Sequence, residues 1–442
     1  MPFTYLGLPL GTTKPSVLDM TPWVCKAEGR ITAAMSLMSY AGKLALMNSL
    51  VTSLAIYPMG VLRLPPKIIE QLDKIRRHGL WKKKTETGDK SISLAAWDMV
   101  CRPKKNGGLG VLNLKVQNDA MLLKLLHKFY NKFDAPWVHL VWDTYYASTI
   151  PHAAAPCGSF WWRQLIQLMP IYRGITKVKI GAGDTALFWK DDWNNSILSE
   201  TYPRAFSFTR DEDASAQKFL SITHLNQAFD LPLSVQAFDE LRALQQNVIT
   251  ATMTDSKDAW ICTWGSADFK TTAYYTFYFR EMIAHDAYRW LWKTKCIPKI
   301  KVFGWFLLSD RLNTRNMLKR RHYNIGNNFD CQLCGCHVEE TVEHLFFHCT
   351  FSTACWNKLN VLWPSQGNRL ELMTHLKTLN PRKMIMDVFL VAAWSLWKER
   401  NNNYFRQVAP SVSSWKTRFK DFASISHRVP DHKKQIVATI LD

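Results

Sequence analysis

Acidic residues are scarce in this chain of 442 amino acids. It has 36 Asp and Glu against 56 Lys and Arg, which leaves a formal net charge of +20 at pH 7. Such an excess favours polyanions, either nucleic acid or an anionic membrane surface. At 47% hydrophobic residues the chain is too apolar to be disordered, and its length allows two to four domains.

Signals for secretion or membrane insertion are also lacking. Residues Met1–Tyr5 have neither the charged start nor the apolar core of a secretory signal. The longest uncharged run, 44–62, contains Asn48, Pro58 and Gly60, and its apolar residues fit one helical face. This run therefore predicts a buried helix rather than a membrane span. We expect an intracellular protein, nuclear or cytoplasmic, that is not secreted and has no membrane partner.

Common catalytic motifs are missing too. The chain has no Gly-x4-Gly-Lys-Ser/Thr phosphate loop, no His-Glu-x2-His and no Gly-x-Ser-x-Gly. Asp191-Asp192 could hold a divalent metal for nucleotidyl transfer. That chemistry needs a further carboxylate and a phosphate-facing basic residue, and neither is identifiable. We interpret the pair as a turn with solvated acids, and we expect no catalytic residues.

Half of the ten cysteines lie in a short segment. A disulfide framework is not expected without a secretory signal, whereas clustered cysteines with nearby histidines are typical of metal sites. The pattern Cys331-x2-Cys334-x9-His344-x4-Cys349 predicts a tetrahedral zinc site, with the first pair in a tight turn and the second from a helical stretch. Such closed sites are structural, and binding of roughly 10–16 kcal/mol becomes folding free energy. Replacement of a named ligand by Cys336 or His348 stays open.

Basic residues gather in two windows. Residues 63–105 carry a net +7, and residues 289–326, just before the zinc pattern, carry +9. Cations neutralise phosphates and aromatic rings can stack on bases, so we expect RNA or DNA to bind through these patches. The candidate phosphate contacts are Lys293, Lys295, Lys299, Lys301, Arg311, Arg315, Lys319, Arg320 and Arg321.

Hydrophobic periodicity predicts a mainly α, multi-domain fold, with small antiparallel β elements in the middle and a zinc-stapled helical module. Helical periodicity covers 24–57, 66–81, 116–130 and 387–405. Residues 5–11 suggest strands or turns, 177–189 a β-hairpin around Gly181 and Gly183, and 202–209 and 260–269 further short strands. We expect four regions: a helical one at 1–130, an irregular α+β one at 131–272, a zinc-binding one at 273–362 and a helical extension at 363–442.

The zinc-binding segment resembles a known family, the reverse-transcriptase zinc-binding domain (zf-RVT) of plant non-LTR, LINE-like retrotransposons. The residues that carry the resemblance are Trp292-Lys293, Pro298-Lys299-Ile300-Lys301, Phe303, Trp305, Asp310-Arg311-Leu312, Thr314, Leu318, Arg321, Cys331, Cys334, Glu340-Thr341, His344-Leu345-Phe346, Cys349, Ser352 and Trp356. The remaining chain also resembles these proteins. Tyr5 to Gly11 is similar to the stretch that closes their polymerase palm, and Gly107 to Gly110 to the thumb or connection that follows. Asp387 to Phe405 is similar to their C-terminal extension.

The resemblance implies a retroelement fragment that follows the palm. The palm's aromatic-x-Asp-Asp box precedes the Tyr-Leu-Gly stretch in the family, so the polymerase carboxylates are expected to lie outside this sequence. We therefore expect a non-catalytic, zinc-dependent nucleic-acid-binding fragment. One alternative is a structural or protein-interaction zinc module of a degenerate retroelement protein, without a nucleic-acid role. Another is a reverse transcriptase that acts with a separate palm.

Overall fold

The computed structural model divides the chain into two compact units, each built from several segments. The first comprises Met1–Ala27, Ser53–Leu72 and Leu114–Tyr278, and the second Glu28–Thr52, Asp73–Asn113 and Phe279–Asp442. The structure describes residues 3–5, 8–11, 13–31, 35, 37–83, 90–147, 150–151, 157–248, 253–381 and 384–426. Within these ranges no helix is both long and apolar enough to cross a membrane. The four consecutive regions expected from the sequence stay a prediction.

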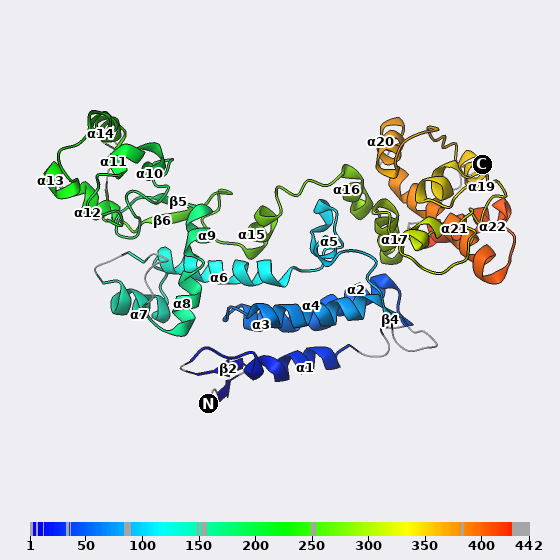
Figure 1. Cartoon of the computed structure of the whole chain (residues 1–442), viewed down its shortest axis with the longest axis horizontal. Helices are drawn as coiled ribbons and strands as arrows, with labels where there is room; N and C mark the ends of the chain where they lie inside the picture. The colour runs from blue at the N-terminus through cyan, green and yellow to red at the C-terminus, as the bar shows by residue number, and fades with distance from the viewer. Residues whose placement is uncertain are drawn as a thin grey trace. The chain divides into compact units, whose positions relative to one another are not determined.

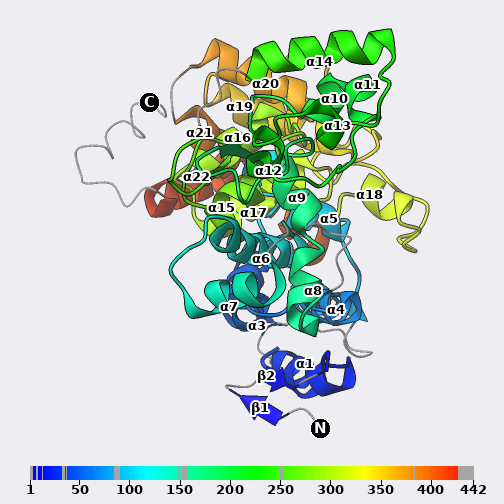
Figure 2. The ribbon, with the colours of Figure 1, turned by 90° about the vertical axis from the view of Figure 1, so that its left-hand side faces the viewer.

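The fold is mainly helical, as predicted, and its described sheets are three antiparallel pairs (Figure 1). In the first unit lie β1 (Phe3–Tyr5), β2 (Leu8–Leu10), η1 (Leu18–Met20), α3 (Ser53–Met59), α6 (Leu114–Tyr130), α7 (Pro136–Tyr145), α8 (Phe160–Ile166), α9 (Met169–Gly174), β5 (Thr176–Lys179), α10 (Leu198–Thr201), α11 (Pro203–Phe206), α12 (Ala216–Leu220), α13 (Leu225–Ala228), α14 (Val235–Val248), β6 (Ala259–Cys262) and α15 (Thr271–Tyr278). There α11 packs against both α10 and α14 (Figure 2).

The second unit holds the C-terminal helices and two segments from earlier in the chain. Its elements are α2 (Tyr40–Leu46), η3 (Met47–Thr52), β3 (Lys82–Lys83), β4 (Lys90–Ser91), α5 (Trp97–Cys101), η4 (Lys104–Asn106), α16 (Asp286–Lys293), α17 (Pro298–Leu308), α18 (Arg315–Arg320), η5 (His344–His348), α19 (Thr350–Asn357), α20 (Arg369–Leu379), α21 (Ile385–Arg406) and α22 (Val412–Ser426). Helices α1 (Thr21–Gly29) and α4 (Pro66–Trp81) run from one unit into the other.

Helices α4, α6 and α21 confirm the predicted spans closely, whereas the span predicted over 24–57 is divided between α1, α2, η3 and α3. Helix α2 starts anew because the Ser39 side chain accepts a hydrogen bond from the amide of Gly42, which caps its first turn. Strands β1 and β2 confirm the strands suggested near the N-terminus.

The β-hairpin predicted over 177–189 is wrong. Strand β5 pairs antiparallel with β6 instead, with Thr176 opposite Cys262 and Lys179 opposite Ala259. The loop after β5 wraps around the buried carboxylate of Asp258, which accepts hydrogen bonds from the amides of Gly181 and Gly183, both at 2.8 Å. The strand suggested at 202–209 is also wrong, because Pro203 begins helix α11 there, a favoured place for proline.

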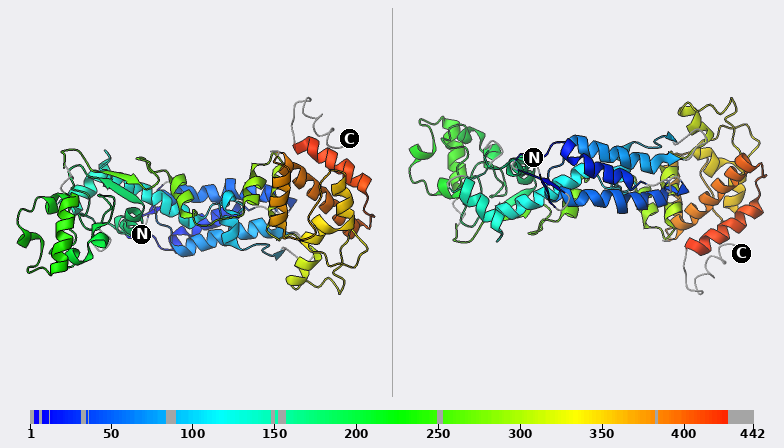
Figure 3. Two further views of the ribbon diagram at one scale, coloured as in Figure 1. Left: turned by 90° about the horizontal axis from the view of Figure 1, so that it is seen from above. Right: turned by 90° about the horizontal axis from the view of Figure 1, so that it is seen from below.

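Helix α17 is the centre of the second unit's core. Every residue from Val302 to Leu308 is buried, against α16 on one side and α21 on the other. Helices α21 and α22 lie side by side (Figure 3), and the buried indole of Trp415 donates to the carbonyl of Ala392 at 3.2 Å. This packing gives the segment 329–356, which carries the cysteines, a rigid support.

Candidate metal centre

Two of the four predicted ligands, Cys331 and Cys334, lie in a short hairpin-like loop. Asp330 and Glu339 form an antiparallel bridge at its base, and the amide of Cys331 donates to the carbonyl of Val338 at 2.8 Å. The amide of Leu333 points back to the sulfur of Cys331 at 3.4 Å. The turn thus holds both thiols on its inner side, as the spacing of two residues predicts.

The other two ligands, His344 and Cys349, are joined by a π-helical turn rather than by an α-helix. Residues five apart do not share a face of an α-helix. Here the amide of Cys349 donates to the carbonyl of His344 at 2.7 Å, which is the i to i+5 bond of a π-turn. This wider turn brings both side chains to the same side, a detail that the sequence did not reveal.

The four donor atoms meet at one point. The three sulfurs and a ring nitrogen of His344 all lie within 4.8 Å of one another. The sulfurs of Cys331 and Cys349 are 3.8 Å apart, and the sulfur of Cys334 is 3.4 Å from Nε2 of His344. Zinc–ligand bonds of about 2.0–2.3 Å give a tetrahedron with edges of about 3.5–3.8 Å. The cluster is therefore consistent with zinc binding.

The two alternative ligands lie outside this group. Cys336 is exposed, with its sulfur 4.0 Å from the hydroxyl of Thr350. His348 lies in the same π-turn as His344 but does not join the cluster that the described residues form.

The electrostatics of the cluster favour a thiolate at Cys349. The hydrogen bond from the thiol of Cys331 lowers the pKa of Cys349 and raises that of Cys331. Amides of Phe351 and Ser352, at the start of α19, also lower the pKa of Cys349, as expected at a helix N-terminus. Thiolates are the metal-binding form, so the protein's own donors prepare one ligand and zinc would displace the remaining thiol protons.

A buried ion pair anchors the metal-binding loop to α21. Glu340 is fully buried and accepts hydrogen bonds from the guanidinium of Arg400 at 2.7 and 3.2 Å. The same carboxylate also accepts from the amides of Gln332, inside the cysteine turn, and Arg315. The Arg400 guanidinium lies 5.0 Å from the ring centres of Trp397 and Tyr404. Charged residues are rarely buried without a partner, but Arg400 lies between Glu399 and Asn401 in the sequence, so its burial had no local signal.

Three of the nine candidate phosphate contacts lie exposed on or beside α16 and α17. These are Lys293, Lys295 and Lys299. The ammonium of Lys299 lies 5.5 Å from the ring of Trp394. Lys301 is half-buried, with its ammonium 3.4 Å from the carbonyl of Trp292.

The other candidates lie around α18, and several have internal partners. Lys319 pairs with Glu339 at 3.2 Å, and Arg320 pairs with Asp310 at 2.6 Å. Arg315 lies over the ring of Tyr404. Arg311 and Arg321 line one cavity together. The structure therefore brings together only a part of the predicted set.

Asp191 and Asp192 do not form a pair of solvated acids, which corrects the interpretation from the sequence. Asp191 is buried, where its carboxylate pairs with Arg173 at 2.9 Å and accepts from the amide of Leu187 at 2.6 Å. Burial raises the pKa of Asp191, and Arg173 opposes this rise. Asp192 pairs with Lys177 at 3.3 Å. Both carboxylates hold the loop between β5 and α10 in place.

The comparisons with known proteins agree with this geometry. Residues 269–356 match the family described as zinc-binding in reverse transcriptase, and all four donors fall inside the match. The chain is also 24% identical over 393 residues to a protein of Arabidopsis thaliana named a putative ribonuclease H protein. That alignment covers 83% of this chain and 61% of the relative, so the chain spans about three fifths of the relative's length. The chain thus carries a zinc-binding module similar to those of reverse transcriptases and has a distant plant relative.

Proposed function

We propose that this chain is a non-catalytic, nucleic-acid-binding part of a plant non-LTR, LINE-like reverse transcriptase, with zinc as a structural ion. The observation that carries the proposal is the cluster of three cysteines and one histidine inside a segment that matches the reverse-transcriptase zinc-binding family. In this proposal, residues 1–130 correspond to the thumb and connection, and residues 363–442 to the C-terminal extension.

The donor set supports a structural role for the ion. Three thiolates and one imidazole complete a tetrahedral shell and leave no position for a substrate. Bound zinc would supply cross-links between the cysteine turn, the π-turn and the start of α19. The ten cysteines are free thiols, which suits a reducing compartment, so we place the protein in the nucleus or cytoplasm.

The basic segment before the cluster supports nucleic-acid binding. Of its ten cations between Arg289 and Gly326, three have carboxylate partners, namely Arg289, Lys319 and Arg320. The other seven have none within the described residues. A cation without a carboxylate partner keeps its charge unbalanced and can neutralise a phosphate. The carboxylates of Asp191 and Asp192 are engaged in ion pairs, which supports a binding role rather than a catalytic one. Primer extension by the purified chain would contradict the non-catalytic role.

Zinc analysis combined with a nucleic-acid titration tests the proposal. Wild-type protein should contain about one zinc per chain, as one closed site requires, and should bind RNA or DNA oligonucleotides. Cys331→Ser should lose most of the zinc and weaken binding, because Glu340 of the metal-binding loop holds the start of α18, which carries Arg315, in place. Cys336→Ser, a cysteine outside the cluster, is the matched control and should keep both properties.

A purely structural or protein-interaction zinc module is the second candidate. The Glu340–Arg400 pair favours this second function, because it attaches the metal-binding loop to the core without any nucleic acid. The double variant Lys299→Glu, Lys301→Glu separates the two functions. Loss of oligonucleotide binding with zinc content unchanged supports the first function, whereas unchanged binding supports the second.

A further inference from the structure

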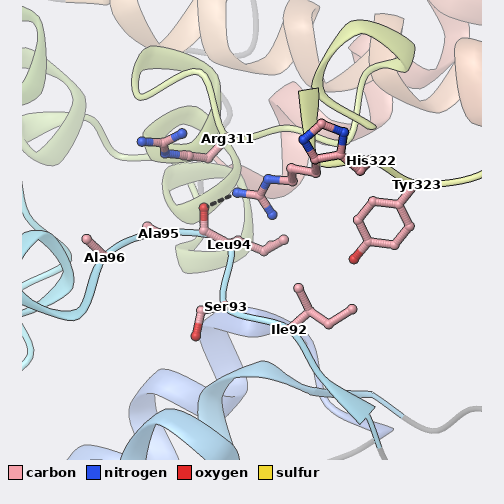
Figure 4. Close-up of a pocket in the computed structure, with 9 residues that line it drawn as sticks. Ile92, Ser93, Leu94, Ala95, Ala96, Arg311, His322 and Tyr323 are labelled. Atoms are coloured by element: carbon pink, nitrogen blue, oxygen red, sulfur yellow. Dashed lines mark hydrogen bonds between the residues drawn. The ribbon is translucent and has the colours of Figure 1, made fainter. Parts of the chain in front are cut away.

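A cavity of about 640 Å³ lies in the second unit and is lined by none of the four zinc ligands. Its floor is the extended segment 92–96, and its walls are Arg311, Arg321, His322 and Tyr323. Figure 4 shows Arg311 on one side and His322 and Tyr323 on the other, above Ser93 and Leu94. Volumes of about 300–1,000 Å³ are usual for ligand sites.

The cavity is positively charged, and none of the described residues that line it is a carboxylate. The guanidinium of Arg321 donates one hydrogen bond to the carbonyl of Leu94 (dashed line in Figure 4). Nη1 of Arg321 and Nε of Arg311 are buried and have no acceptor among the described residues. Burial, together with the charges of Arg311 and Arg320, lowers the pKa of Arg321. Asp310, the acidic residue beside Arg311 in sequence, is engaged with Arg320.

Unsatisfied buried donors are costly, and more so when they are charged. Both guanidiniums line the cavity, where a bound anion would offset their like charges, and arginine is well shaped to bind phosphate oxygens in pairs.

The aromatic wall of the cavity is held rigidly by the end of α18. The amide of Tyr323 donates to the carbonyl of Leu318 at 3.0 Å, and the amide of His322 donates to that of Lys319 at 2.9 Å. His322 has φ of 56°, in the left-handed region. These are the two bonds and the conformation of a Schellman C-cap. Tyr323 is 38% exposed, so one side of its ring is open for a nucleobase to stack.

We propose that this cavity binds one nucleotide of a single-stranded RNA or DNA, with its phosphate between Arg311 and Arg321 and its base against Tyr323. The inference rests on the nucleic-acid binding proposed above and names where a strand is held. A second cavity of about 470 Å³ shares Arg311 and Leu94 with the first and is lined by Lys299, Trp394 and Trp397. In this proposal the strand continues from the first cavity into the second, past Lys299 and Trp394.

Fluorescence anisotropy with a labelled oligouridine RNA of about 12 nucleotides, a length within the usual range of single-strand sites, tests the phosphate contact. Arg311→Gln should weaken binding about tenfold or more, because a charge-assisted contact is lost. Arg289→Gln removes the same charge from a residue that pairs with Asp286 and lines neither cavity. It should weaken binding less than about threefold, as a paired surface cation contributes little.

Photo-cross-linking of wild-type protein to the same RNA carrying 5-iodouridine tests the base contact without any substitution. Mass spectrometry should find the adduct on Tyr323, and Tyr323→Ser should abolish it. If Arg311→Gln fails to fold, as judged by circular dichroism, the position of the cross-link alone decides whether the strand binds in this cavity.

The outcomes separate the two proposals. Wild-type binding with equal affinities for Arg311→Gln and Arg289→Gln, or an adduct elsewhere, overturns the cavity site and leaves nucleic-acid binding intact. Failure of the wild-type protein to bind RNA and an oligothymidine of equal length overturns the proposed function and the site together.

Discussion

At the residue scale, Glu340 joins three parts of the second unit. Its carboxylate accepts hydrogen bonds from Arg400 on α21, from the amide of Gln332 in the cysteine turn and from the amide of Arg315 at the start of α18. Glu340 is 0% and Arg400 3% exposed, so water cannot replace either partner. A buried pair of this kind need not add much net stability, but loss of one partner leaves the other uncompensated.

We therefore expect Glu340→Gln to lower the free energy of unfolding by about 3–5 kcal/mol, the usual result of breaking a buried ion pair. Urea denaturation followed by circular dichroism measures the change. Glu339→Gln is the matched control, since its partner Lys319 is half exposed and such surface pairs contribute about 0–1 kcal/mol. Equal destabilisation by the two substitutions would contradict a special role for Glu340.

Single residues differ in how far the sequence predicts them. Cys331, Cys334, His344 and Cys349 could be identified because metal-ligand spacing is a local property of the chain. The partnership of Glu340 with Arg400 could not, because 60 positions separate them. Both residues have charged neighbours in the sequence, Glu339 and Glu399, so no local pattern shows that these two charges are buried.

At the scale of elements, the close approach of α17 to its neighbours depends on Gly304. A Cβ atom at this position would lie 2.5 Å from Cδ2 of Leu390 and 2.7 Å from Cδ1 of Leu291. Glycine lowers helix stability by about 0.8–1.0 kcal/mol relative to alanine, so its presence inside a helix points to packing. The space taken by a methyl group is already filled by α16 and α21.

Gly304→Ala should therefore destabilise the protein by about 1–3 kcal/mol, the range for overpacked cores, despite the better helix propensity of alanine. Gly29→Ala is the control, because a Cβ there meets nothing within 4 Å. Thermal melting of both variants beside wild type measures the effect. A stabilised Gly304→Ala protein would show that α17 can move away from α21 without cost.

Elements with strong local signals were predictable, and elements that depend on distant pairing were not. The periodicity of 66–81 and the proline at its start predicted α4 with its observed ends. Strand β5 looked like half of a hairpin, but its partner β6 begins at Ala259, far along the chain, and the preceding Asp258 holds the loop after β5 through its carboxylate. The π-turn at His344 has no signature in propensity, and it follows from the positions of the ligands.

At the scale of the whole molecule, the net charge of +20 follows from the composition. The composition does not show which cations lack a carboxylate partner and can therefore contact a phosphate. Lys299 and Lys319 are both exposed lysines of the same basic segment. The structure gives Lys319 a carboxylate partner, Glu339, and Lys299 a contact with the ring of Trp394. Only a cation whose phosphate contact replaces a condensed counterion contributes to the salt dependence of binding.

The salt dependence of RNA binding should distinguish these two lysines. For single strands, the logarithm of the binding constant falls with that of the salt concentration by about 0.7 per phosphate contact. If some three to seven unpaired cations take part, the wild-type slope should be about −2 to −5 between about 50 and 200 mM salt. Lys299→Gln should make this slope shallower by about 0.7, whereas Lys319→Gln should leave it nearly unchanged, because its charge is already balanced by Glu339. Anisotropy titrations at several salt concentrations measure the slopes. Equal slopes for both variants would mean that the strand does not follow α17, and a wild-type slope near zero would exclude phosphate contacts as the basis of binding.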